Sequence, residues 1–160
     1  MIIRPARPED DEAIWRIIGP TIRAGETYAL PRDMTRDAAL AYWRGPAHEA
    51  FVAETDDGIL GTYYMRPNQQ GGGSHVANCG YMTRADATGR GIARAMAEHS
   101  LVHAKARGFL AMQFNCVVST NARAIALWQR LGFAIAGTLP GAFDHPTHGF
   151  VDAYVMVRWL

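Results

Sequence analysis

The sequence has only two cysteines, no long apolar run and almost no imbalance between positive and negative charge. Cys79 and Cys116 form no CxxC pair or zinc-type cluster, so we expect reduced, structural thiols. The net charge of +1 argues against a strongly basic nucleic-acid-binding surface. No window approaches the ~18 apolar residues of a membrane span, and the N-terminus becomes charged too soon for a signal peptide. These absences predict a cytoplasmic protein that binds neither nucleic acid nor membrane.

The remaining pattern predicts one mixed α/β domain over residues 1–160. Asp57-Gly58 separates two β-rich runs, which indicates a hairpin. Gly80 inside the next strand suggests a bulge. Pro140 and Gly141 indicate that a loop covers 140–150. Alternation and helical periodicity give the order strand, two helices, three strands, helix, strand, helix and two strands. The predicted strands are 2–6, two within 49–66, 75–83, 110–118, 133–139 and 151–160, and the helices end near Arg23, Arg44, Gly108 and Gly132.

The stretch TGRGIAR, residues 88–94, places two glycines and two arginines where a helix begins. A helix N-terminus has unpaired N–H groups and partial positive charge, and glycine lets a bulky anion approach the backbone. We therefore expect a diphosphate there, although a plain turn with solvated arginines is the alternative. The P-loop pattern GxxxxGK[ST] is absent, and GxGxxG fails at Arg94. Nucleotide hydrolysis and dinucleotide binding are accordingly disfavoured.

These residues resemble the GNAT superfamily of N-acetyltransferases. Its cofactor motif, Gln or Arg, two variable residues, Gly, one variable residue, then Gly or Ala, matches 88–93 except at Thr88. A second family segment, beginning with Asn and ending Gly-Phe, matches NARAIALWQRLGF at 121–133. The resemblance covers essentially the whole chain. It implies the acyl-CoA N-acyltransferase fold, a mixed sheet of about seven strands with a splayed central pair and about four helices.

The resemblance also implies an acetyl-CoA site. Tyr81 and its neighbours would hold the pantetheine arm through free backbone groups, with Met82 or Thr83 donating to the thioester carbonyl. Asn121 matches the asparagine near the pantetheine, and capping its helix is a compatible role. Trp128 replaces the family's tyrosine acid; it either packs against the cofactor or belongs to the core. The diphosphate would bind at Thr88, Gly89, Arg90, Gly91, Ile92, Ala93 and Arg94.

The strand 75–83 lacks the carboxylate that many relatives use as a base. His75, acting through a water, is the first candidate, with a solvated histidine as the alternative, and Tyr81 is a second candidate for proton handling. Asn78 and Asn115 are expected to face one side of neighbouring strands and bind the acceptor, or to satisfy strand ends; Asn115 also stands among the catalytic candidates. Glu26 and Tyr28 would line the acceptor site.

The resemblance is greatest to small-molecule and amino-acid acetyltransferases of the phosphinothricin and azetidine-carboxylate type. The predicted activity is transfer of acetyl from acetyl-CoA to a small, amino-acid-like amine, without a metal. His145 and His148 look like loop packing rather than metal ligands. A non-catalytic acetyl-CoA sensor is the alternative function. A protein-tail acetyltransferase is disfavoured because the composition suggests no acidic groove, and a homodimer is left open.

Overall fold

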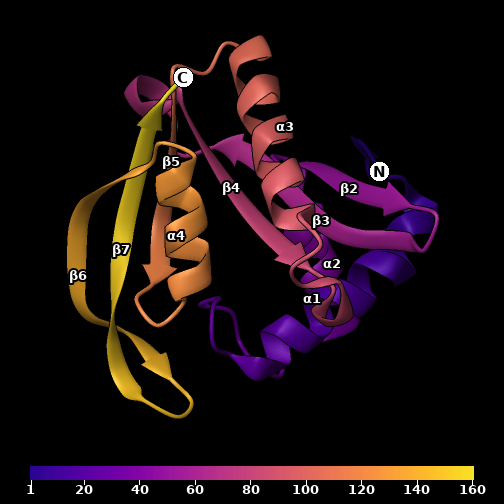
Figure 1. Cartoon of the computed structure of the whole chain (residues 1–160), viewed down its shortest axis with the longest axis horizontal. Coiled ribbons are helices and arrows are strands. Elements are labelled where there is room, and N and C mark those ends of the chain that lie inside the picture. Colours follow the sequence, from indigo (N-terminus) through magenta and orange to yellow (C-terminus); the bar gives the residue numbers. More distant parts are fainter.

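The computed structural model describes all 160 residues and contains a seven-stranded sheet with helices on both faces (Figure 1). The expected order of elements is confirmed. Short 3-10 turns cover Pro8–Asp10, Gly71–Gly73 and Ala85–Ala87. The strands are β1 (Ile2–Pro5), β2 (Glu49–Thr55), β3 (Gly58–Pro67), β4 (Val76–Thr83), β5 (Ala111–Val118), β6 (Ala134–His145) and β7 (Gly149–Trp159). The helices are α1 (Asp11–Ala24), α2 (Arg36–Trp43), α3 (Ile92–Ala106) and α4 (Ala122–Arg130).

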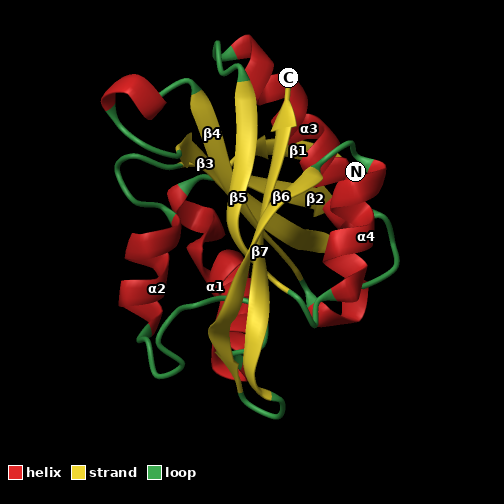
Figure 2. Cartoon of the chain, turned by 90° about the vertical axis from the view of Figure 1, so that its left-hand side faces the viewer, coloured by secondary structure: helices red, strands yellow, loops and turns green.

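Helices α1 and α2 cover one face of the sheet, and α3 and α4 cover the other (Figure 2). Successive strand residues serve opposite faces: Tyr63 packs in the cluster beneath α3, and Tyr64 packs in the cluster beneath α1 and α2. This is why β3 contains a run of buried residues instead of a polar–apolar alternation. No helix is both long enough and apolar enough to cross a bilayer.

The sheet follows the order β1-β2-β3-β4-β5-β7-β6, and its single parallel contact, between β4 and β5, is very short. Only Val76 pairs with Ala111 and Ala77 with Met112, after which the two strands diverge (Figure 1). The rest of β4 and β5 therefore lacks a strand partner on the sides that face each other. The splayed central pair expected from the resemblance is present.

Two local predictions were wrong. Gly80 causes no bulge, since β3 and β4 pair without a register shift from Gly61–Thr83 to Pro67–Ala77. The predicted loop over 140–150 is mostly strand. A shift in register between Leu139 and Phe143 accommodates Pro140 and Gly141, and the Gly141 amide donates to Asp152 Oδ1 at 2.9 Å. The hairpin of β6 and β7 is consequently longer than expected. The prediction failed because proline and glycine are typical of both β-bulges and loops, so the sequence does not distinguish the two.

Candidate active site

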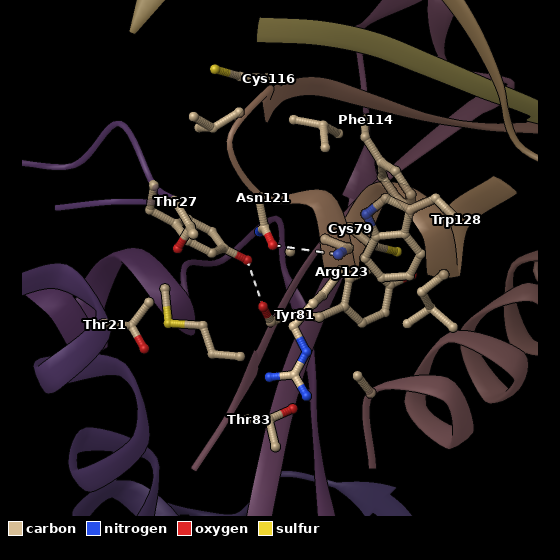
Figure 3. A pocket seen from close by; sticks show the side chains of 18 of the residues that line it. Thr21, Thr27, Cys79, Tyr81, Thr83, Phe114, Cys116, Asn121, Arg123 and Trp128 are labelled. Carbon is tan, nitrogen blue, oxygen red and sulfur yellow. Dashed lines mark hydrogen bonds between the residues drawn. The ribbon is translucent and has the colours of Figure 1, made fainter. Parts of the chain in front are cut away.

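A cavity of about 1050 Å³ runs from the N-terminus of α3 through the gap between β4 and β5 to the face covered by α1 and α2. Its size lies at the upper end of the range for small-molecule sites. Figure 3 shows side chains of β4, β5, α1 and α4 converging on it. Among the predicted site residues, the lining includes Tyr28, Asn78, Tyr81, Met82, Thr83, Thr88, Gly89, Gly91, Ile92, Ala93, Arg94, Asn115, Asn121 and Trp128.

The turn before α3 presents a row of free amides to the cavity. Gly89 and Gly91 have φ angles of 84° and 79°, a left-handed conformation that favours glycine. The first helical bond is donated by Ala95 to the Gly91 carbonyl. The amides of Gly89, Gly91 and Ile92–Arg94 donate to no acceptor within the chain. With the positive end of the helix dipole, these amides form an anion-binding surface.

Arg90 does not belong to this surface. Its side chain points to the β2–β3 hairpin, where Nη2 donates to Asp57 Oδ2 at 2.7 Å, and its amide donates to the Ala87 carbonyl. Arg94 does line the cavity, although its Nε also donates to Glu98 Oε1 at 2.8 Å. The structure therefore leaves Arg94 available to an anion and removes the Arg90 side chain from the predicted set.

Backbone pairing decides which groups of β4 face the gap. Arg84 N donates to Leu60 O at one end of the β3–β4 ladder, and Asn68 N donates to Val76 O at the other. In an antiparallel ladder, alternate residues of a strand bond to the same neighbour, so the Met82 amide pairs with β3. The amides of Cys79, Tyr81 and Thr83 point to the other side of β4, toward the gap. Met82 can therefore not donate to a thioester carbonyl. Thr83 and Tyr81 can do so.

Tyr81 presents its backbone groups, and not its hydroxyl, to the cavity. The hydroxyl lies against Ser100 Oγ at 2.7 Å, and burial raises the Tyr81 pKa well above its usual range, so it cannot act as a base near neutral pH. The Tyr81 carbonyl accepts a bond of 2.9 Å from the Tyr28 hydroxyl. This bond, drawn in Figure 3, ties the segment after α1 to the open edge of β4. Burial likewise raises the Tyr28 pKa, so its hydroxyl remains a donor.

Asn121 and Trp128 bring α4 to the same cavity. Asn121 caps α4 by accepting from the Ala124 amide at 3.4 Å, so the capping role is present. Asn121 also lines the cavity. The Trp128 ring is buried, with its centroid 4.8 Å from that of Phe114 and 5.1 Å from that of Tyr81. Trp128 is thus both a core residue and part of the cavity wall, with its indole nitrogen edge turned to the cavity (Figure 3).

On the side of α1 and α2, the cavity wall is formed by tyrosines and one arginine. Tyr42 and Tyr64 place their hydroxyls 3.3 Å apart. The Tyr64 ring stacks on His48 with centroids 4.3 Å apart, which fixes its position. Arg66 lies on the same face of β3, and its only hydrogen bond runs from Nε to Asn78 Oδ1 at 3.5 Å. No carboxylate pairs with Arg66, so its guanidinium is free for an anionic group.

Asn78 and Asn115 both line the cavity but are held by protein partners. Asn78 Nδ2 donates to the Gln113 carbonyl at 3.0 Å, just past the last parallel pair, and so completes the hydrogen bonding where the strands part. Asn115 accepts from Gln113 Nε2 at 2.9 Å and donates to Asn68 Oδ1 at 2.7 Å. The strand-end role is therefore observed for Asn78, whereas the exposed Asn115 bonds only to the side chains of Gln113 and Asn68.

The structure does not bring His75 or Glu26 into the cavity. His75 is exposed just before β4, where its ring lies 6.4 Å from that of Trp159, at the closed end of the β4–β5 pair. Glu26 is exposed beside α1. Their expected roles as base and acceptor ligand are not supported by this geometry. The rings of His145 and His148 lie 4.6 Å apart in the last hairpin, tilted by 36°. No group of three or more His, Cys, Asp or Glu residues is placed to hold a metal.

Sequence reasoning missed Tyr42, Tyr64, Arg66 and Arg123, all of which line the cavity. Arg123 occupies the first turn of α4, where a cation is unfavourable to the helix dipole, and that position was an available signal. Figure 3 shows it directed toward Thr83 across the gap. Tyr64 and Arg66 could not be assigned without knowing which face β3 presents to the cavity, and Tyr42 could not be assigned without knowing how α2 packs on the sheet.

Replacing Gly80 by alanine tests the packing around Tyr64. An added Cβ would lie 2.6 Å from Tyr64 Cε1 and 3.0 Å from its hydroxyl. Because Tyr64 is stacked on His48 and edged by Trp43, it cannot move freely. We expect G80A to destabilise the fold by about 1–3 kcal/mol, measured by denaturant unfolding.

The matched control is G137A, since an added Cβ at Gly137 meets nothing within 4 Å and its φ is not in the left-handed region. This substitution should change stability by no more than about 0.5 kcal/mol. Equal stabilities of the two variants would contradict the tight contact described for Gly80.

Comparison with known proteins gives a consistent result. The chain matches the Acetyltransferase (GNAT) family over residues 13–133. It is 33% identical over 151 residues to the N-acetyltransferase aca1 of Schizosaccharomyces pombe, covering 84% of this chain and 72% of that protein. A GCN5-related N-acetyltransferase from Kribbella flavida superposes with a TM-score of 0.94 at 44% identity, covering 99% and 97% of the two chains.

A third similarity shows the fold alone. The phosphinothricin acetyltransferase of Sinorhizobium meliloti, solved in complex with acetyl-CoA, superposes with a TM-score of 0.86 at 22% identity, covering 99% of this chain and 88% of that one. The splayed sheet, the free amides before α3 and the family match over most of the chain agree with the resemblance found in the sequence. The chain belongs to the GNAT family of acetyl-CoA-dependent N-acetyltransferases.

Proposed function

We propose that this protein transfers the acetyl group of acetyl-CoA to the amine of a small acceptor that carries a carboxylate. The observation that carries the proposal is the single cavity that joins two unlike binding surfaces. The free amides before α3 suit a diphosphate, and the unpaired Arg66 on the opposite side of the β4–β5 gap suits a carboxylate. A thioester in the gap would lie between them.

The cofactor would bind along the gap. The amides of Gly89, Gly91 and Ile92–Arg94 would hold the diphosphate, and Arg123 would add positive charge from α4. The amides of β4 that face the gap would bind the pantetheine arm as a strand is bound. Proteins with this fold have been solved with acetyl-CoA, which supports acetyl-CoA as the cofactor.

The chemistry requires the acceptor nitrogen to meet the thioester carbonyl carbon at contact distance. Amide donors of Tyr81 or Thr83 would stabilise the negative charge that develops on the carbonyl oxygen. The indole N–H of Trp128 faces the cavity, where it can donate a hydrogen bond to the departing sulfur. Indole cannot supply a proton, so the thiolate takes its proton from elsewhere. A thiol pKa of roughly 8.5 makes it a tolerable leaving group.

The test is release of free thiol from acetyl-CoA by the purified protein, with a panel of amino acids, cyclic imino acids and the corresponding amines that lack a carboxylate. We expect thiol release above background with carboxylate-bearing acceptors and little with the others. Tight acetyl-CoA binding without thiol release for any amine would favour the sensor alternative. Preference for amines without a carboxylate would contradict the role given to Arg66.

A further inference from the structure

The cavity wall contains no residue able to accept a proton from an ammonium group. Its charged residues are four arginines, and no Asp, Glu, Lys or His lines it. The residues with charged or titratable side chains that line the cavity come from β3, β4, β5, α2, α3, α4 and the segment after α1: Tyr28, Tyr42, Tyr64, Arg66, Cys79, Tyr81, Arg94, Cys116, Arg123 and Arg130. The arginines stay protonated, and a phenol or thiol accepts a proton only after losing its own.

Burial keeps the phenols and thiols of the wall protonated. It raises the pKa of Cys79 to about 12 and moves the pKa values of Tyr28, Tyr64 and Tyr81 above their usual range. It also raises the pKa of Cys116. His48, the imidazole nearest to the tyrosine wall, lies behind the Tyr64 ring, with Nδ1 at 3.2 Å from the Trp43 carbonyl oxygen. The ring of Tyr64 therefore separates His48 from the cavity.

Arg66 is the one charged residue that lines the cavity on the side of α1 and α2. Arg66 has no carboxylate partner, and its single side-chain hydrogen bond is long. A fixed positive charge nearby disfavours the ammonium form of a bound amine and lowers its pKa. A protonated acceptor would therefore bind poorly and would find no base. A neutral amine meets neither difficulty.

We propose that this enzyme takes its acceptor as the free, neutral amine and selects weakly basic, carboxylate-bearing amines whose neutral form is well populated near neutral pH. This inference rests on the proposed function. The amine nitrogen forms the C–N bond, the C–S bond breaks, and the sulfur leaves with its electron pair. The proton lost by the nitrogen passes to the thiolate, so the products are an N-acetyl amine and free coenzyme A, and no protein base is required.

The pH dependence distinguishes this proposal from catalysis by a protein base. For each panel amine that releases thiol, kcat/KM is measured from pH 6 to pH 10. Because kcat/KM reports groups of the free reactants, it should rise about tenfold per pH unit and level off at the acceptor's own amine pKa. The inflection should move from one acceptor to another as their amine pKa values differ.

A matched pair of probes sharpens the comparison: 2-aminobutyrate and its 4,4,4-trifluoro analogue, which has nearly the same shape and a less basic amine. At pH 7 the trifluoro compound should have the larger kcat/KM, by about tenfold, because more of it is neutral. Above both amine pKa values the order should reverse, since the more basic nitrogen is the better nucleophile.

Arg66→Gln gives a second readout. The profile of kcat reports the bound acceptor, and its inflection should lie below that of kcat/KM in the unsubstituted enzyme. Removing the Arg66 charge should move the kcat inflection upward by about one pH unit. R107Q is the control, since Arg107 is exposed and paired with Glu49 at 3.0 Å outside the cavity; it should leave the profile unchanged.

An inflection at one fixed pH for every acceptor would indicate a protein base and overturn the proposal. So would a larger rate at pH 7 for 2-aminobutyrate than for its trifluoro analogue. Absence of thiol release with every amine is a different outcome, because it would contradict the proposed function before the question of a base arises.

Discussion

Replacing Gly91 by valine is expected to weaken acetyl-CoA binding at least about 100-fold while the protein still folds. Gly91 has a φ of 79°, and a β-branched side chain would change the direction of the amides that begin α3. Each hydrogen bond to a charged group contributes about 1.5–3 kcal/mol, so misdirecting two of them gives an effect of this size. Titration calorimetry with acetyl-CoA and thermal unfolding of the same variant measure the two consequences separately.

Gly108 provides a matched control at the other end of the same helix. It has a φ of 86°, and an added Cβ would meet nothing within 4 Å, as at Gly91. It does not line the cavity. G108V should therefore carry the same backbone strain, about 1–2 kcal/mol, and keep its affinity for acetyl-CoA. Equal affinities in the two folded variants would remove the turn before α3 from the cofactor site.

At a pH where kcat has levelled off, replacing Arg66 by glutamine is expected to lower kcat/KM for carboxylate-bearing acceptors by about 100-fold, chiefly through KM. The guanidinium can form two parallel bonds to a carboxylate, and a neutral amide cannot replace the charge. Acceptors that lack the carboxylate should lose little. The measurement is a comparison of the two acceptor classes in R66Q and in the R107Q control.

The acceptor specificity of R66Q distinguishes carboxylate binding by Arg66 from a purely structural role. An equal loss for both acceptor classes would mean that Arg66 supports the fold of the compartment instead of binding the carboxylate. Calorimetry with acetyl-CoA should show unchanged cofactor affinity, because Arg66 lies on β3, away from the amides before α3. Loss of cofactor affinity would contradict the division of the cavity into two surfaces.

Local patterns predicted the element order and the glycine turn because both depend on short-range chemistry. Thr35, for example, caps α2 by accepting from the Ala38 amide, only three residues along the chain. The residues on the acceptor side of the cavity were harder to predict. Arg66 and Asn78 are opposite each other only because of the β3–β4 register, and a glycine-rich connection hides that register in sequence. The prediction that His75 lies in the site failed for a related reason. Its distance from the gap depends on where β4 parts from β5, which the sequence does not reveal.

Pairing along β4 also explains why Met82, one of the two predicted thioester donors, directs its amide away from the gap. The two faces of a strand can be read from residue types, whereas the direction of each amide depends on which neighbour it pairs with. Met82 and Thr83 are adjacent in sequence, yet their N–H groups point to opposite sides of β4. Arg90 illustrates the same limit, because its partner Asp57 lies on a distant hairpin.

Because the β4–β5 contact is short, a ligand that fills the gap should add to the stability of the sheet. The junction between a four-stranded half of the sheet and a three-stranded half is short: between β4 and β5 it consists of two residue pairs, the bond from the Leu110 amide to the His75 carbonyl, and the Asn78 side chain. A ligand lying in the gap would cross-link these halves, and at a concentration 100 times its Kd it would add about 2.7 kcal/mol to the free energy of unfolding. Amide hydrogen exchange in β4 and β5 should therefore slow when the gap is filled, which makes the cofactor a structural member of the sheet between turnovers.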